Sequence, residues 1–189
     1  MLNYTEEKDF KGLDFAVNSL KKGEYERCTF SDCCWGGVDL SGFIFIDCTF
    51  NSCDLSNAGL KNTAFRTVSF NQCKMIGLHF EDCAPGLFFV SFDNCQLQLG
   101  SFHGHKMKAT SFKNCRLTES NFSDCDLRNA DFSYAELQLA RFDNCQLEDA
   151  DFRAASGLEL DPERNRLQGA HFNLEQLPAL LHEYQIRVY

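Results

Sequence analysis

Large apolar residues recur at every fifth position along almost the whole chain. One register runs from Phe10 to Phe80, and a second, shifted by two residues, runs from Leu87 to Phe152 and returns at Leu167 and Phe172. Neither a helix nor an ordinary strand repeats every five residues, so the period predicts a solenoid built from one repeated unit. Phenylalanine dominates the centres of these units, and the three phenylalanines outside them are Phe43, Phe88 and Phe89.

Two positions before each centre the residue is usually small, most often cysteine or alanine. Each unit therefore reads small, polar, large apolar, polar, polar. Ala130–Tyr134 and Ala150–Ala154 are clear examples, and they resemble the pentapeptide-repeat family, whose consensus is Ala-Asp/Asn-Leu-x-x. The resemblance implies an all-β fold, a right-handed quadrilateral β-helix with one pentapeptide on each face and about 20 residues in each coil. The large centre and the small residue before it would point inward.

The residue types support four faces independently of the resemblance. From Phe92 to Phe152 the centres alternate strictly between Phe and Leu or Met. Alternate faces of a square coil are opposite faces, so each coil would hold two opposed phenylalanines and two opposed aliphatic residues. Stacked coils would then form separate Phe and Leu ladders, which fill a narrow core.

The chain has 11 cysteines, and several recur at intervals of 20 residues. If the two extra residues near Pro85 only bulge a corner, five cysteines share one inward column with a spacing of about 4.8 Å. Parallel side chains in a column suit neither a disulfide nor the converging ligands of a zinc site. We therefore expect small buried hydrophobes, no metal and no cofactor, with Cys34 as an outward exception. The column comprises Cys33, Cys53, Cys73, Cys95 and Cys115.

The first break in the repeat lies near residues 83–90, where Pro85 and Gly86 mark a turn. Phe88 and Phe89 lie off-centre there, so we expect them to be partly exposed. They would form, with Pro85, a contact patch on a loop, or else cover a bulged corner. Phe43 and His105 place bulky groups at inward small positions, which indicates locally widened coils; a ligand role for His105 beside His103 is the alternative.

The second break divides the end of the chain. Residues 1–172 are expected to form the β-helix, with an irregular coil near 154–166 in which Leu158 and Leu160 replace the missing centres. Residues 173–189 read as a short C-terminal helix and tail, opened by a capping-box pattern at Asn173 and Gln176. Because the open end of a solenoid must be covered, we expect this segment to cap the rod and to join a homodimer; a monomer cap is the alternative. The interface residues would be Leu174, Leu177, Leu180, Leu181, Tyr184 and Ile186.

The formal charge is −9 and the pI is near 5.0, which argues against direct binding to nucleic acid and suits a basic protein partner. Residues 119–163 hold twelve acidic and three basic side chains, so this stretch alone carries −9. We take its outward carboxylates as the candidate binding surface; the alternative is that they only keep the rod soluble. The residues singled out are Asp126, Asp131, Glu148, Asp149 and Asp151.

Other function classes find little support in the sequence. There is no nucleophile with a base and an orienting group, and no Gly-rich phosphate loop, so we do not expect an enzyme. The chain has no run of about 18 apolar residues, and residues 1–10 lack the pattern of a signal peptide. We therefore expect a cytoplasmic protein that does not bind membranes.

Within the family, the chain resembles bacterial topoisomerase-protection proteins: the Qnr-like quinolone-resistance group and the self-immunity proteins of organisms that produce gyrase poisons. The likeness rests on Cys48–Cys53, on Cys73–Gly77 and on the ending from Gly157 to Val188. It implies a rod-shaped homodimer, joined at its C-terminal ends, that mimics DNA and binds DNA gyrase or topoisomerase IV. Such a protein confers antibiotic resistance or immunity against a quinolone or a peptide-type gyrase inhibitor.

Two observations keep other functions open. The mid-chain insertion is only two residues, where some quinolone-resistance relatives carry longer loops. A dimer would carry twice −9, or −18, whereas B-DNA about 80 Å long carries about −47, so charge would account for only part of the mimicry. The alternative function is a generic interaction scaffold with no topoisomerase partner.

Overall fold

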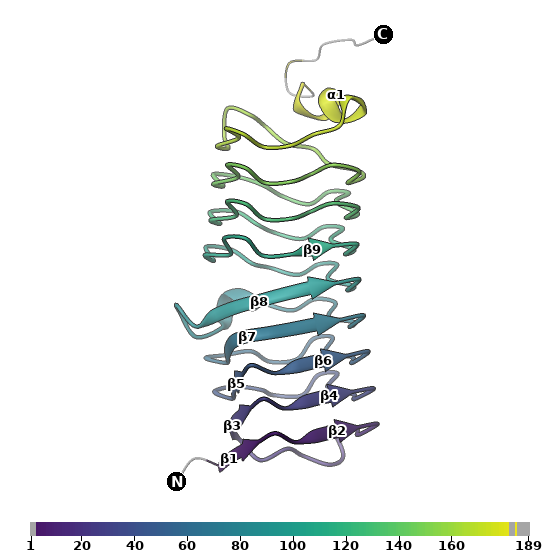
Figure 1. Ribbon diagram of the computed structural model, residues 1–189, viewed down its shortest axis with the longest axis vertical. Helices are drawn as coiled ribbons and strands as arrows, with labels where there is room; N and C mark the ends of the chain where they lie inside the picture. The colour runs from purple at the N-terminus through teal and green to yellow at the C-terminus, as the bar shows by residue number, and fades with distance from the viewer. Residues whose placement is uncertain (1–2, 182–183, 185–189) are drawn as a thin grey trace.

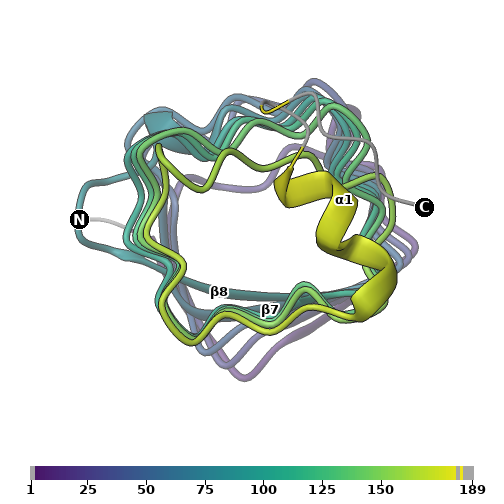
Figure 2. The same cartoon turned by 90° about the horizontal axis from the view of Figure 1, so that it is seen from above.

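The computed structural model describes residues 3–181 and residue 184, and its chain winds into a right-handed, four-sided parallel β-solenoid (Figure 1). Seen along the axis, successive coils superimpose on a four-sided outline (Figure 2). The expected quadrilateral β-helix is therefore confirmed. The strands are β1 (Asn3–Glu6), β2 (Asp9–Lys11), β3 (Gly23–Glu26), β4 (Thr29–Ser31), β5 (Ile44–Ile46), β6 (Thr49–Asn51), β7 (Ala64–Asn71), β8 (Phe88–Asp93) and β9 (Phe112–Lys113).

Each strand pairs in parallel with the strand one coil further along. In β4 and β6, for example, Thr29 is the partner of Thr49 and Phe30 the partner of Phe50, an offset of 20 residues. Nearer the C-terminus the ladder continues as isolated parallel bridges, such as the one between Asp131 and Asp151. Parallel pairing in this register places equivalent side chains of successive coils directly above one another.

The corners of the coils depend on residues in the left-handed region of backbone conformation. Asp124, Asn129 and Asp149 have φ values of 60°, 60° and 59°. Among side-chain-bearing residues, Asn and Asp enter this region most readily. Part of the polarity at the last position of each unit is therefore a requirement of the turn.

The core is built from aromatic ladders. One face contributes a continuous stack in which eight successive pairs of rings lie 4.7 to 5.5 Å apart. A second ladder begins at Phe80, and the two meet edge to face, as between Phe112 and Phe122 at 5.4 Å and 85°. Both geometries are favourable for aromatic pairs. The first ladder comprises Phe10, Phe30, Phe50, Phe70, Phe92, Phe112, Phe132, Phe152 and Phe172.

All 11 cysteines are free thiols, and only Cys34 is exposed. The buried thiols donate to backbone carbonyls, as Cys53 does to the carbonyl oxygen of Phe30 at 3.4 Å. Burial raises the pKa of the Cys48 thiol to about 12 and that of Cys145 to about 11. Cys48 and Cys145 therefore act as small core residues with little thiolate character.

The mid-chain bulge differs from expectation in one respect. Strands β7 and β8 pair with a register shift: Phe65 is the partner of Phe88, and Val68 the partner of Val90. Phe88 therefore points inward and is only 4% exposed, while Leu87, taken from the period as a centre, is only partly buried. The prediction that Phe88 is partly exposed was wrong, because the slip within the bulge moves the inward position by one residue. Phe89 is 61% exposed.

The last coil is irregular, and a short helical segment covers it. Leu158 and Leu160 are buried, as expected for substitutes of the missing centres. The segment consists of one 3-10 turn, η2 (Leu174–Gln176), followed by one α-helical turn, α1 (Leu177–Leu180). Another 3-10 turn, η1 (Phe80–Asp82), lies just before the mid-chain bulge. Within the described part of the chain, none of these helices has the length and apolar character needed to span a membrane.

Candidate partner-binding surface

The five singled-out carboxylates lie on two adjoining faces and on the corner between them. Asp126 and Glu148 belong to one face, Asp131 and Asp151 form a bridged pair on the next, and Asp149 occupies the corner with φ 59°. The bridged pair is separated by one strand spacing, about 4.8 Å. The fold thus gathers residues spread over 26 positions (126 to 151) into one surface, which we call the acidic surface.

Several of these aspartates also hold the backbone. The carboxylate oxygen Oδ1 of Asp131 accepts the backbone N–H of Ser133 at 2.9 Å, and Asp151 accepts that of Arg153 at 2.9 Å. The same turn is present far from this surface, at Asp39. Asp is favoured there because its side chain mimics a backbone turn, so the residue type alone does not identify a binding site.

Arginines two residues further along neutralise two of the five carboxylates. Asp126 pairs with Arg128 at 2.6 Å, and Asp151 pairs with Arg153 at 2.7 Å. The hydrogen bonds from these guanidinium groups hold the pKa of both carboxyls below the usual range. The sequence predicted the net charge of this stretch, but these pairs were not anticipated.

The three other carboxylates are available to a partner. Among residues 3–181 and 184, no basic side chain forms an ion pair with Asp131, Glu148 or Asp149. One carboxylate oxygen of Glu148, Oε2, is shielded from solvent and has no hydrogen-bond partner in the described structure. An unpaired, partly desolvated carboxylate gains most from an incoming basic group.

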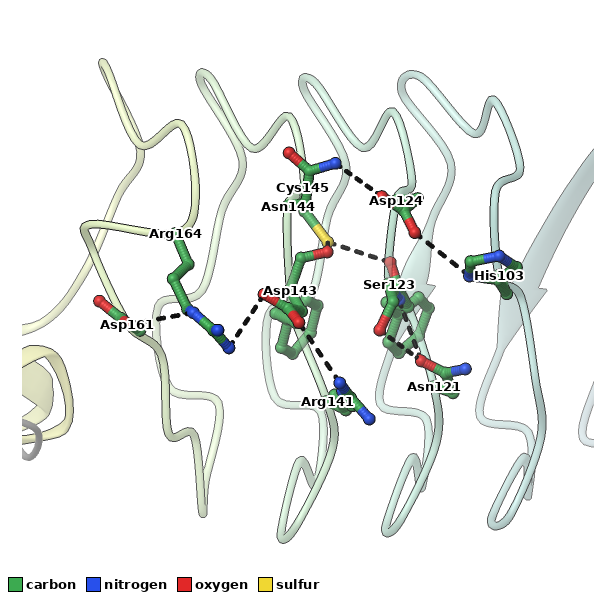
Figure 3. A network of polar contacts seen from close by, with 12 residues as sticks. His103, Asn121, Ser123, Asp124, Arg141, Asp143, Asn144, Cys145, Asp161 and Arg164 are labelled. Carbon is green, nitrogen blue, oxygen red and sulfur yellow. Dashed lines mark hydrogen bonds and ion pairs between the residues drawn. The ribbon is translucent and has the colours of Figure 1, made fainter.

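A third face carries Asp124, Asp143 and Asp161, and each of these contacts a neighbouring nitrogen-bearing side chain (Figure 3). Asp124 lies 3.5 Å from Nδ1 of His103. Asp143 binds both Arg141 and Arg164 at 3.3 Å. These contacts join residues up to 21 positions apart, one coil along the rod. A 20-residue period could have indicated them in the sequence, but they were missed because only the number of charges was considered.

The C-terminal segment forms a second candidate surface. Leu174, Leu177 and Tyr184 are 78%, 41% and 47% exposed, whereas Leu180 packs against the core and Leu181 is half-buried. Leu180 therefore caps the rod, and the apolar side chains that face outward are those of Leu174, Leu177 and Tyr184. Ile186, also expected at the interface, lies outside the described residues.

The mid-chain loop presents less surface than expected. Pro85 and Phe89 are exposed, but Phe88 is buried and offers a protein partner almost no surface. No group of three or more His, Cys, Asp or Glu side chains within the described ranges is arranged to hold a metal ion.

A continuous repeat with inward ladders, left-handed corners and polar outer faces defines a pentapeptide-repeat solenoid. The model of the pentapeptide repeat region matches residues 43–122 and 99–172. The chain belongs to this family.

Solved structures show what the chain is similar to. One is QnrB1, a plasmid-mediated fluoroquinolone resistance protein. Its trypsin-treated form is 21% identical to this chain, the match covers 99% of this chain and 100% of the QnrB1 chain, and the TM-score is 0.45. Its full-length form is 22% identical over 97% of this chain and 100% of its own, with a TM-score of 0.42. HetL, involved in heterocyst differentiation regulation in Nostoc sp. strain PCC 7120, is 13% identical over 88% and 84%, with a TM-score of 0.39. The comparison with curated proteins found no match.

Proposed function

We propose that this protein binds a type II topoisomerase, DNA gyrase or topoisomerase IV, through the acidic surface and protects the enzyme from a poison. The observation that carries the proposal is the set of carboxylates of Asp131, Glu148 and Asp149, on two adjoining faces and the corner between them, which form no ion pair with another described residue. A topoisomerase presents basic groups to the phosphates of DNA, and an anionic rod of fixed shape can occupy the same groups. The sequence resemblance to topoisomerase-protection proteins supports this choice of partner.

The rod supports such contacts because its charges are fixed. The acidic side chains rise from strands and corners that the backbone ladder holds in place, so little conformational entropy is lost on binding. A dimer would carry a charge of −18, twice the −9 of one chain, against about −47 for DNA of equal length. Shape and the exposed loop residues Pro85 and Phe89 therefore contribute to the proposed contact.

We also propose that two copies join through the C-terminal segment, which doubles the length of the rod. Leu174 and Leu177 present apolar side chains to solvent at its end, and burying them against a second copy would be favourable. The double variant Leu174→Ser, Leu177→Ser should shift the protein from dimer to monomer in sedimentation. The matched control Leu99→Ser, Leu139→Ser removes two other exposed leucines and should leave the dimer intact. A monomeric native protein would contradict this part of the proposal.

The first experiment is gyrase supercoiling with a fluoroquinolone or with a peptide-type gyrase inhibitor, each titrated with this protein. Topoisomerase IV decatenation is measured in parallel. The protein should restore activity under at least one poison. The triple variant Asp131→Asn, Glu148→Gln, Asp149→Asn should lose enzyme affinity by at least about tenfold. Asparagine preserves both the turn at 131 and the left-handed corner at 149, so folding is maintained.

The control removes three charges of the same kinds at the other end of the rod: Asp32→Asn, Glu24→Gln, Asp39→Asn. Asp32 occupies a corner with φ 54°, and Asp39 holds a turn through Ser41, so the two triple variants are matched in structure. Equal protection by both variants would show that the acidic surface is not the contact.

The alternative function is an interaction scaffold without a topoisomerase partner. The turn-forming hydrogen bond of Asp131 and the corner position of Asp149 favour it, because both give these acids a structural reason to be present. If the native protein neither rescues nor inhibits gyrase and topoisomerase IV, the topoisomerase proposal is wrong. The function as an interaction scaffold is then the remaining interpretation.

A further inference from the structure

A cavity of about 490 Å³ opens between the mid-chain bulge and the following coil. Its lining residue Lys106 is bridged to Asp126, one coil further along, but the proposed topoisomerase contact does not require the cavity. The extra residues of the bulge push the corner outward, and the imidazole of His105 stands where other coils carry a small residue. Its volume is within the range that small-molecule sites occupy.

One wall of the cavity is a fixed aromatic surface. The ring of His105 stacks on that of Phe88, with centroids 4.3 Å apart and planes inclined by 30°. His105 donates from Nε2 to the carbonyl oxygen of Phe80 at 2.7 Å, because a carbonyl can only accept. Burial lowers the pKa of His105, so the ring is neutral at pH 7 and its Nδ1 remains an acceptor. Phe89 and Pro85 extend this wall toward solvent.

Lys106 supplies a positive charge to the lining of the cavity. It forms no ion pair with any residue in the described ranges. Residues 94–118 contain three lysines and one arginine, with no aspartate or glutamate. The carboxylate of Glu81 also lines the cavity, 3.1 Å from Nδ1 of His79. An anionic group entering the cavity would bind at the ammonium of Lys106, the lining residue of opposite charge.

We propose that this cavity binds a small aromatic carboxylate. Its ring lies against Phe88, Phe89 and His105, where offset stacking is favourable. Its carboxylate accepts a charge-assisted hydrogen bond from the ammonium of Lys106.

The probe for the test is 2-naphthoate, with 2-naphthamide as the neutral molecule of the same shape. Both are titrated into the isotopically labelled full-length protein and followed by NMR. We expect saturable shifts at Gly104 and in the ring of His105 with 2-naphthoate, and binding of 2-naphthamide weaker by about tenfold. Absence of saturable shifts at these residues, or equal binding of the amide, would overturn the proposal.

Variants at exposed positions separate the site from general surface charge. Lys106→Met and Phe89→Ala should each weaken 2-naphthoate by about fivefold to tenfold. Lys108→Met removes the same charge two residues away, outside the cavity, and should change the affinity by less than about twofold. Because these side chains are exposed, the variants should keep the fold, which unchanged amide shifts outside residues 79–107 would verify. Equal losses in Lys106→Met and Lys108→Met would contradict the assigned site.

Discussion

The side-chain amide of Gln176 donates hydrogen bonds to the carbonyl oxygen of Phe152 at 2.6 Å and to that of Ala155 at 2.8 Å. Its Oε1 accepts the backbone N–H of Asn173 at 2.8 Å. One side chain therefore binds two carbonyls of the last described coil, and it starts the helical segment at the same time.

We expect Gln176→Ala to loosen the last coil. Loss of these bonds leaves the carbonyl of Ala155 without this partner, whereas that of Phe152 still accepts the N–H of Ala155 at 3.0 Å. Local opening should become easier by about 1–2 kcal/mol, seen as roughly fivefold to thirtyfold faster amide exchange around Phe152. Gln168→Ala, at an exposed position nearby, serves as the control. Equal exchange in the two variants would refute a capping role for Gln176.

The aromatic ladder should dominate stability. Phe122 stacks on Phe102 and Phe142 and meets Phe112 and Phe132 edge to face. Phe122→Ala should lower the free energy of unfolding by about 3–5 kcal/mol, because it leaves a cavity in a fully packed column. Phe89→Ala, at the exposed position of the bulge, should change it by less than about 0.5 kcal/mol. Denaturant unfolding measures both, and similar losses would disprove the ladder as the main source of stability.

The pairing of Asp151 with Arg153 should be visible in a carboxyl titration. Arg153 lowers the pKa of Asp151 in the folded state, so the pair stabilises the fold above the unfolded pKa of about 3.9. This contribution is lost as the pH falls through the lower folded value. Arg153→Gln should raise the pKa of Asp151 in an NMR titration and leave that of Asp126 unchanged, while Arg128→Gln should do the reverse. An unmoved Asp151 in Arg153→Gln would mean that the ion pair does not form in solution.

Thiol chemistry should single out Cys34. It is exposed, whereas the other cysteines are buried, and burial raises the pKa of Cys48 and Cys145. A disulfide reagent added to the native protein should therefore label about one thiol per chain rapidly, and the remaining thiols only after unfolding. Cys34→Ser should abolish the rapid phase. Rapid labelling that persists in this variant would show that a buried column opens readily.

Much of the fold could be predicted from the sequence because the repeat is also the structure. The five-residue period indicated which side chains point inward, and the alternation of Phe and Leu indicated opposite faces. Asn173 and Gln176 located the start of the C-terminal helix, although α1 extends only to Leu180.

The errors and omissions arose where local patterns are ambiguous. Leu87 and Phe88 are adjacent and both apolar, so the period could not show which of them would face the core once the bulge shifted the register. The acidic surface was predicted as a set of residues, but its unpaired members were not. The contacts that decide this, such as Arg164 with Asp143, depend on the stacking of coils and not on neighbouring residues.

The shift of one residue at Phe88 has a consequence for how the chain finds its register. Stacked coils of equal length, with phenylalanine over phenylalanine, could slip by one whole coil with little loss of core contact. Among the described coils, only one has a 22-residue step, from Phe70 to Phe92. The imidazole of His105 stacks on Phe88 in that same region, so a slipped arrangement would lose this contact. The bulge thus specifies the stacking register of the coils in an otherwise repetitive chain.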